Sequence, residues 1–337
     1  MSTSEYSHLK ISGPVSARRL EKGEKFIKRR RLILLLGLTG TGKSSFIERL
    51  SGDTTHDISG NSLDSVTQDI VPYEVTNLRD APPLSEQVYL IDTPGVCDTQ
   101  LSELRLVTSL QAWIKTASLP TVVLYFHRIT DKRLCGSQRK ILNIIRGLVG
   151  EPKTYKTWTG IVTTMWDMVP EHQLAAAEER LRCLKENHFK NICGMDVRVD
   201  DNVLRFYNTK ESTLQVINDA VRCWSYAGVI LVRDPPLQRF QGDKLRQSPF
   251  GPPLFELLQE RIEGLEQRIQ MLNEDLAQEG TLDNPELTNI LIQDKVSAQQ
   301  VLEEMKRDRE AYLSLAENLP KPSTGRRITN YLKNKFI

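Results

Sequence analysis

The sequence predicts an α/β fold in which a mostly parallel sheet is covered by helices on both faces and is followed by a helical C-terminal region. Three observations predict it. Short apolar runs, which are typical of buried parallel strands, alternate with helical patterns from residue 32 to about 225. Beyond residue 253, apolar residues recur in steps of three and four, as in packed helices. The 337 residues, 39% hydrophobic and 26% charged, suffice for one large domain and an appendage.

The first 31 residues are polar and then basic, and we expect them to form an arm with at most one short helix. The main domain is expected to span residues 32–232. Its predicted strands are 32–36, 71–76, 87–91, 121–126, 158–163 and 203–207. Its predicted helices are 43–51, 100–117, 137–149, 171–189 and 210–224.

The C-terminal third divides into three predicted parts. Residues 233–253 are rich in Pro and Gly and predict a linker. Residues 254–319 predict two helices, separated at 280–285, where Asp283 or Asn284 can cap the second helix before Pro285. They form either a hairpin, folded on itself or on the main domain, or an intermolecular coiled coil. Residues 320–337 form a basic amphipathic tail, which either docks as a helix or touches an anionic membrane surface.

Charge and cysteine content limit the function classes. The net charge of +2 gives no strong attraction for nucleic acid, and we expect no such partner. The five cysteines show no CxxC pair or metal-ligand spacing, which favours reduced intracellular thiols. No apolar run approaches the roughly 20 residues of a membrane helix. We therefore expect a cytoplasmic protein.

A phosphate-binding loop follows the first predicted strand of the domain. Gly37-Leu38-Thr39-Gly40-Thr41-Gly42-Lys43-Ser44 fits the pattern GxxxxGK[ST] at every fixed position, between a strand and a helix. The glycines let backbone N–H groups and the helix N-terminus face phosphate, Lys43 adds a positive charge, and Ser44 adds a Mg²⁺ ligand. The expected nucleotide contacts in this loop are Gly37, Thr39, Gly40, Thr41, Gly42, Lys43, Ser44 and Ser45.

The run VYLIDTPG supplies a second element of the predicted metal site. Asp92 ends an apolar run, where its carboxylate can hold Mg²⁺ through water, and the N–H of Gly95 can bind a γ-phosphate. Between the two motifs, the hydroxyl of Thr67 in LDSVTQDI is a candidate to complete the metal shell. An ordinary loop threonine is the alternative for Thr67.

Two later segments bear on the choice of base. A guanine reader needs a carboxylate that accepts hydrogen bonds from N1–H and N2–H₂, normally as the last residue of [NT]KxD after a strand. Here Thr164-Met165-Trp166-Asp167 occupies that place, and the Met165 chain can cover the base as the usual lysine stem does. Asn208, after the last strand, suits a loop on the other side of the base. These residues favour guanine, with a helix-capping role for Asp167 as the alternative.

GLTGTGKSS, SVTQDI, DTPGVCDT and VVLYFHRITDKR resemble the septin-related (paraseptin) GTPases, which include immunity-associated GTPases and chloroplast import receptors. The TTMWD variant is similar to that of stand-alone fungal G-domain proteins of this group. The resemblance covers residues 32 to about 225. It implies a P-loop G domain that binds GTP or GDP with Mg²⁺ and pairs across the nucleotide face.

Slow hydrolysis is expected of the isolated domain. Val96 occupies the place where many small GTPases carry a water-orienting glutamine, and Thr39 adds bulk beside the phosphates. Arg128 matches an arginine of the immunity-associated relatives that reaches across a dimer, with a surface ion pair to Asp131 as the alternative. The first hypothesis is a dimer-activated GTPase in which Lys43, Thr67 and Arg128 act in catalysis. A GTP-sensing scaffold with little turnover and an ATPase are the alternatives.

Overall fold

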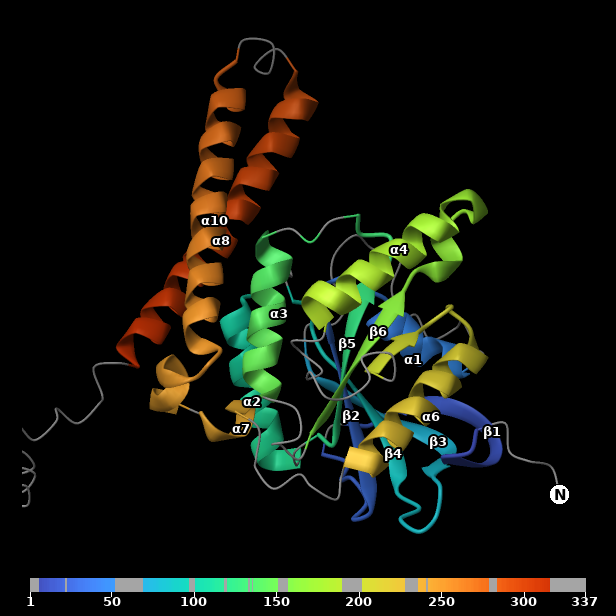
Figure 1. The fold of residues 1–337 in the computed structure, drawn as a ribbon. Coiled ribbons are helices and arrows are strands. Elements are labelled where there is room, and N and C mark those ends of the chain that lie inside the picture. The colour runs from blue at the N-terminus through green and yellow to red at the C-terminus, as the bar shows by residue number, and fades with distance from the viewer. Residues whose placement is uncertain are drawn as a thin grey trace, which may run out of the picture.

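The computed structural model describes residues 6–21, 23–51, 69–96, 101–117, 120–132, 134, 136–150, 157–189, 202–227, 236–240, 242–278 and 284–315. Within this part of the chain, a seven-stranded sheet has the order β1-β3-β4-β2-β5-β6-β7 (Figure 1). The strands are β1 (Leu9–Arg19), β2 (Arg30–Gly37), β3 (Val71–Asp80), β4 (Gln87–Asp92), β5 (Val122–Arg128), β6 (Trp158–Thr164) and β7 (Val203–Arg205).

Five of the seven strands pair in parallel, as predicted. Strand β2 pairs with β4 and β5, and β6 lies between β5 and β7, all in parallel. Strand β3 pairs antiparallel with β4, and β1 pairs antiparallel with β3 at one lateral edge of the sheet, so among the described strands β3 alone runs against the others. Strands β2, β4, β5 and β6 run in one direction, so the segments that follow them meet at the carboxyl ends of the strands. Ligands bind there in folds of this class.

Helices cover both faces of the sheet (Figure 1). The α-helices are α1 (Lys43–Ser51), α2 (Glu103–Ala117), α3 (Gly136–Val149), α4 (Leu174–Leu184), α6 (Lys210–Ala227), α7 (Pro236–Arg239), α8 (Gly251–Leu276) and α10 (Pro285–Ser314). The shorter turns are η1 (Trp166–Met168), η2 (Glu171–Gln173), η3 (Lys185–Phe189) and η5 (Gly242–Gln247). The helix expected over 171–189 is therefore regular only within α4.

Strand β2 shows why both faces are covered. Leu32, Leu34 and Leu36 belong to a core with α2, α3, α4 and the C-terminal helices, whereas Ile33 and Leu35 belong to a second core with α1 and α6. Successive side chains of a strand point to opposite faces, so the uninterrupted apolar run requires a hydrophobic layer on each side.

The prediction of an N-terminal arm is wrong for residues 9–19, which form edge strand β1 and pair with β3 from Leu9 to Arg19. The pairing register shifts between Ile11 and Ser16, around Gly13-Pro14. Leu9, Val15 and Ala17 are buried, but residues 10–14 at this irregularity are exposed or half-buried, so the sequence shows no sustained alternation. Pro is tolerated because an edge strand leaves one side unpaired.

The segment predicted as a linker is packed in its described part. Residues 236–239 form α7 and residues 242–247 form η5, and Leu237, Leu245 and Phe250 are buried in the core beside α2 and α3. Gly147 of α3 lies so close to Phe250 that a Cβ on it would be 2.9 Å from the Phe250 Cβ. These apolar residues fix the start of α8 on the domain.

The two C-terminal helices form an antiparallel hairpin that packs on the domain, which is one of the two predicted alternatives (Figure 1). Arg105 of α2 binds Glu304 and Asp308 of α10 at 2.9 and 3.0 Å, and Arg261 of α8 binds Glu103 of α2 at 3.0 Å.

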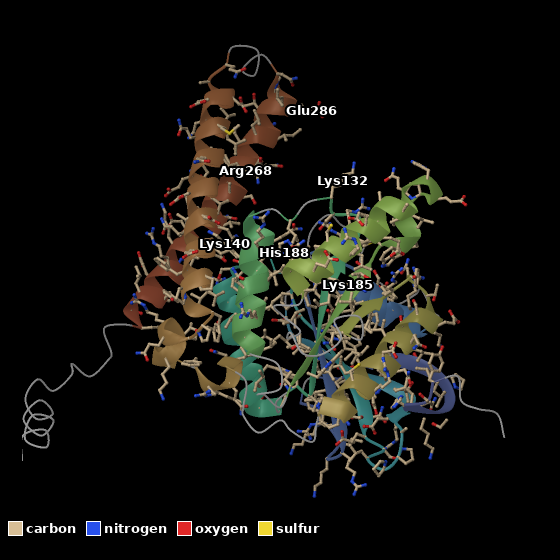
Figure 2. The ribbon with its side chains drawn as sticks, in the orientation of Figure 1. Lys132, Lys140, Lys185, His188, Arg268 and Glu286 are labelled. Atoms are coloured by element: carbon tan, nitrogen blue, oxygen red, sulfur yellow. The ribbon has the colours of Figure 1, made fainter. Side chains whose placement is uncertain are left out.

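Lys140 of α3 lies beside the lower part of the hairpin, where it pairs with Glu260 of α8, whereas Arg268 and Glu286 lie on the part that projects beyond α3 (Figure 2). Asn284 caps α10 through its side-chain oxygen, as predicted for this position. Within the described residues, no helix has both the length and the apolar content needed to cross a membrane. The tail at residues 320–337 lies outside the described residues.

Candidate nucleotide-binding site

The glycine-rich loop between β2 and α1 has the backbone shape that its glycines allow. Gly40 and Gly42 have φ of +75° and +85°, in the left-handed region that favours glycine. Lys43 is only 6% exposed, and its Nζ donates to the carbonyl oxygens of Gly37 and Leu38 at 3.3 and 3.2 Å. The lysine therefore lies back along the loop, at the N-terminus of α1, where a phosphate chain would find positive charge.

Two of the other predicted loop residues differ in how they face the site. Thr41 is fully buried, and its hydroxyl donates to the carbonyl oxygen of Leu38 at 2.8 Å, so its side chain braces the loop from within. Ser45 is the third residue of α1 and is partly exposed. Thr41 can therefore contact a phosphate only through its main chain.

Ser44 and Asp92 meet beside the loop. The hydroxyl of Ser44 donates to Oδ2 of Asp92 at 3.1 Å, and Asp92 is 1% exposed. Asp92 ends β4, the parallel neighbour of β2, which brings its carboxylate next to the start of α1. Hydroxyl and carboxylate oxygens are the ligands that Mg²⁺ prefers, so this pair fits the predicted metal position. The third predicted ligand, Thr67, lies outside the described residues.

The residue that follows the DTPG segment, Val96, is hydrogen-bonded to the phosphate loop. The N–H of Thr39 donates to the carbonyl oxygen of Val96 at 3.2 Å, and the N–H of Val96 donates to that of Gly37 at 2.9 Å. A Cβ on Gly95 would lie 2.1 Å from Oγ1 and 2.6 Å from Cα of Thr39. Only glycine therefore permits this close approach of the two loops.

The predicted base-reading residues gather at one corner, after β6 and β7. Nδ2 of Asn208 donates to Oδ2 of Asp167 at 3.1 Å, and the Met165 methyl group lies 3.8 Å from the position a Cβ on Gly42 would take. Both Met165 and Asn208 have left-handed φ values, 62° and 59°. Such conformations are uncommon for non-glycine residues and cluster at functional sites.

Thr164 lies next to this corner but is turned into the sheet. It is 1% exposed, and its hydroxyl donates to the carbonyl oxygen of His127 on β5 at 3.4 Å. The hydroxyl of Thr164 therefore braces two strands, and a contact between Thr164 and the nucleotide stays a prediction.

Arg128 lies at the rim of its own phosphate loop. One of its terminal nitrogens is 3.8 Å from the position a Cβ on Gly40 would take. Its Nε is 3.1 Å from Oδ1 of Asp131, at ion-pair distance, while Oδ2 of Asp131 accepts from Nε2 of Gln138 at 2.9 Å. The ion pair to Asp131 that was the alternative for Arg128 is thus present. The Arg128 side chain is 36% exposed and faces solvent at this rim.

His127 precedes Arg128 but points to the opposite side, into the core. It is 1% exposed, and the ring of Phe189 meets it edge-on at 5.6 Å. Burial lowers its pKa to about 4, with Asp131 opposing and Arg128 adding to the shift. The residue is neutral near pH 7 and belongs to the core.

Arg49 is one residue of the site region that sequence reasoning missed. Its Nε donates to Oδ1 of Asn208 at 2.8 Å, which ties α1 to the base corner. Nothing in the local sequence around Arg49 signals this contact, because 159 residues separate the partners.

Comparisons with known proteins agree with this geometry. Residues 32–154 match the family described as "50S ribosome-binding GTPase". No curated protein matches the chain. A solved structure with similarity is translation elongation factor SelB from Methanococcus maripaludis in complex with the GTP analogue GppNHp, at 10% identity and a TM-score of 0.34.

That alignment covers 60% of this chain and 35% of the SelB chain, and a TM-score this low does not by itself establish a shared fold. The assignment depends instead on the family match, which includes both the glycine-rich loop and the DTPG segment, and on a mostly parallel sheet that brings the two together. Residues 32–154 thus match a GTPase family model, and the sheet and helices built around them have the fold of a P-loop G domain.

Proposed function

We propose that the chain binds GTP and GDP with Mg²⁺ and hydrolyses GTP to GDP and phosphate. The observation that carries the proposal is the contact between Ser44 and Asp92, 3.1 Å apart beside the glycine-rich loop. It joins the two motifs that hold a nucleoside triphosphate and its metal in P-loop NTPases. Lys43 would neutralise the phosphates, and Gly95 would offer its N–H to the terminal one.

Magnesium fits the donors at this position. Ser44 and Asp92 supply oxygen atoms, and Mg²⁺ is commonly bound by one or two protein oxygens together with phosphate oxygens and water. The ion would neutralise charge on the phosphates. The proposed third ligand, Thr67, would add a hydroxyl.

Guanine is the proposed base because of Asp167. Its carboxylate is exposed at the corner and held by Asn208, and a carboxylate accepts from two adjacent N–H donors. Guanine presents N1–H and N2–H₂ side by side, whereas adenine presents an acceptor at N1. The Met165 side chain beside Gly42 offers an apolar cover for the ring.

The proposed hydrolysis is slow in the monomer and faster in a GTP-dependent dimer across the nucleotide face. Val96 has no group that can orient water. Arg128 is the proposed source of the missing charge, supplied to the partner's site in that dimer, because it is partly exposed at the rim of the loop. An arginine on the transferring phosphoryl group is worth roughly 10³–10⁵ in rate in known GTPases. The resemblance to septin-related GTPases supports this arrangement.

A scaffold that binds GTP and barely turns it over is the second candidate. It is favoured by the two hydrogen bonds that join Val96 to Gly37 and Thr39, since they bring an apolar residue to the place where a catalytic glutamine would lie. The cytoplasmic location and the lack of a nucleic-acid partner stay predictions from composition.

The test is phosphate release from GTP and ATP at protein concentrations from nanomolar to tens of micromolar. A specific rate with GTP that rises with concentration, and is lost in Arg128→Ala while GTP binding is retained, supports the dimer-activated enzyme. A rate independent of concentration but lost in Arg128→Ala would mean that Arg128 serves its own site. GTP binding without phosphate release at any concentration would favour the scaffold.

Two variants control this experiment. Lys43→Ala is expected to remove nucleotide binding and with it all phosphate release. Lys140→Ala, on the hairpin side of α3, is the matched control and is expected to leave the rate unchanged, because Lys140 pairs with Glu260 away from the loop. Equal turnover of ATP and GTP, unaffected by Asp167→Ala, would refute the choice of guanine.

A further inference from the structure

Arg49, Asn208 and Asp167 form a chain of hydrogen bonds that joins three separate segments. Arg49 lies on α1, the helix that begins at Lys43 of the phosphate loop, Asp167 lies in η1 after β6, and Asn208 follows β7. Nε of Arg49 donates to Oδ1 of Asn208 at 2.8 Å, and Nδ2 of Asn208 donates to Oδ2 of Asp167 at 3.1 Å.

The chain of hydrogen bonds has one possible direction. A guanidinium can only donate, so the amide oxygen of Asn208 must face Arg49. An ionised carboxylate can only accept, so the amide nitrogen must face Asp167. Both partners therefore demand the same orientation of the Asn208 amide, and the charge of Arg49 strengthens the first bond.

The hydrogen bonds are needed to orient Asp167, because its own segment holds its side chain poorly. It is exposed and belongs to a three-residue turn, Trp166–Met168. A free carboxylate on such a turn would lose side-chain freedom on binding a base, and a carboxylate already held in place loses less. With Oδ2 held by Asn208, Asp167 presents its remaining acceptor sites in a set direction.

The position of Asn208 depends in turn on α1. Asn208 has a left-handed φ of 59°, and its amide faces the helix through the bond from Arg49. Phe206, two residues earlier, also contacts α1, because its ring meets that of Phe46 at 5.2 Å. Arg49 is the residue of α1 with a hydrogen bond to the Asn208 side chain. The same helix thus bears the phosphate site at its start and supports the base corner two turns later.

We propose that Arg49 is a positioning residue for base selectivity, which orients the Asp167 carboxylate toward a donor–donor base edge through Asn208. This inference rests on the proposed binding of guanine nucleotides. Arg49 itself touches no nucleotide in this proposal, so its loss acts on the base and not on the phosphates.

The experiment compares the affinities of the full-length chain for GDP, IDP and ADP by isothermal titration calorimetry. IDP keeps the N1–H of guanine but lacks the N2 amino group, and ADP presents an acceptor at N1. The variants are Arg49→Met, which keeps length but has no donor, Arg49→Lys, which keeps a donor, and Asn208→Ala. Arg222→Met is the matched control, because Arg222 pairs with Asp219 on α6, outside the chain of hydrogen bonds.

We expect Arg49→Met to weaken GDP binding about tenfold, the effect of losing one hydrogen bond to a charged group, with ADP binding unchanged. The preference for GDP over IDP should fall as well. Arg49→Lys should recover part of the loss. Adding Arg49→Met to Asn208→Ala should cost nothing further, because both substitutions break the same chain.

Three results would overturn the proposal. Equal loss of GDP, IDP and ADP affinity in Arg49→Met, or a large fall in melting temperature, would mean that Arg49 only supports the fold. Unchanged GDP affinity would mean that Asp167 is oriented without it. If the unsubstituted chain binds GDP no better than ADP, the proposed function fails first, and the inference fails with it; this outcome is recognised in the unsubstituted protein alone.

Discussion

The buried histidine beside Arg128 predicts how stability depends on pH. His127 is 1% exposed, and its pKa is lowered from 6.5 to about 4, chiefly by burial. Between these two values the unfolded chain binds a proton at this residue and the folded chain does not. The contribution that the neutral His127 makes to stability is therefore fully present above pH 6.5 and is lost as the pH falls toward 4.

The magnitude follows from the shift. A difference of 2.5 between 6.5 and 4, at 1.36 kcal/mol for each pKa unit, amounts to about 3 kcal/mol. This is a large part of the 5–15 kcal/mol that is typical of folded domains. His127→Phe removes the titration and keeps a ring beside Phe189, so it isolates the effect from that of the carboxylates.

The assay is urea unfolding followed by tryptophan fluorescence at several pH values from 7.5 to 4. The free energy of unfolding should fall more steeply in the unsubstituted chain than in His127→Phe, by about 3 kcal/mol over this range. Contributions shared by both proteins cancel in the difference. If the free energies of unfolding of the two proteins ran parallel with pH, the reasoning would be refuted. His127 would then be protonated in the folded state as easily as in the unfolded one.

Three substitutions test the packing around the site and the hairpin. Gly95→Ala should destabilise the nucleotide-free protein by about 2 kcal/mol, since its Cβ displaces Thr39 and breaks two backbone hydrogen bonds of about 1 kcal/mol each. Arg31→Met should cost about 3–5 kcal/mol, because it leaves the carboxylate of Asp80, 2% exposed and 2.5 Å from Arg31, in the interior without this cation. Met305→Ala, at a buried position of α10, should cost about 2–5 kcal/mol. Thermal and urea unfolding measure all three.

Each substitution has a control of the same type. Gly264→Ala, whose new Cβ would meet no atom within 4 Å apart from its chain neighbours and the backbone of its own helix, should stabilise α8 by up to about 1 kcal/mol. Arg18→Met breaks exposed ion pairs and should cost under about 1 kcal/mol. Met271→Ala, at a 64% exposed position, should have little effect. If a control substitution lowered the free energy of unfolding as much as its buried counterpart does, the close packing inferred at the buried site would be contradicted.

The sequence by itself determined the phosphate-binding part of the molecule. The fixed spacing from Gly37 to Ser44 and the apolar run that ends at Asp92 each require a strand followed by a turn, and both are local patterns. Continuous apolar runs likewise predicted the central strands, because a strand buried on both faces has no polar side to alternate with. The structure has these elements within a few residues of the predicted bounds.

Only the tertiary structure decided the features that depend on distant contacts. The irregular register around Gly13-Pro14 hid β1, and the Pro-rich segment that includes Leu237 is held by burial against α2 and α3, whose surfaces no local pattern reveals. The direction of the Arg128 side chain and the link from Arg49 to Asn208 depend on side chains brought together by the sheet. Local patterns encode secondary structure through periodicity and turn chemistry, whereas long-range pairing is settled by which surfaces fit one another once the sheet has formed.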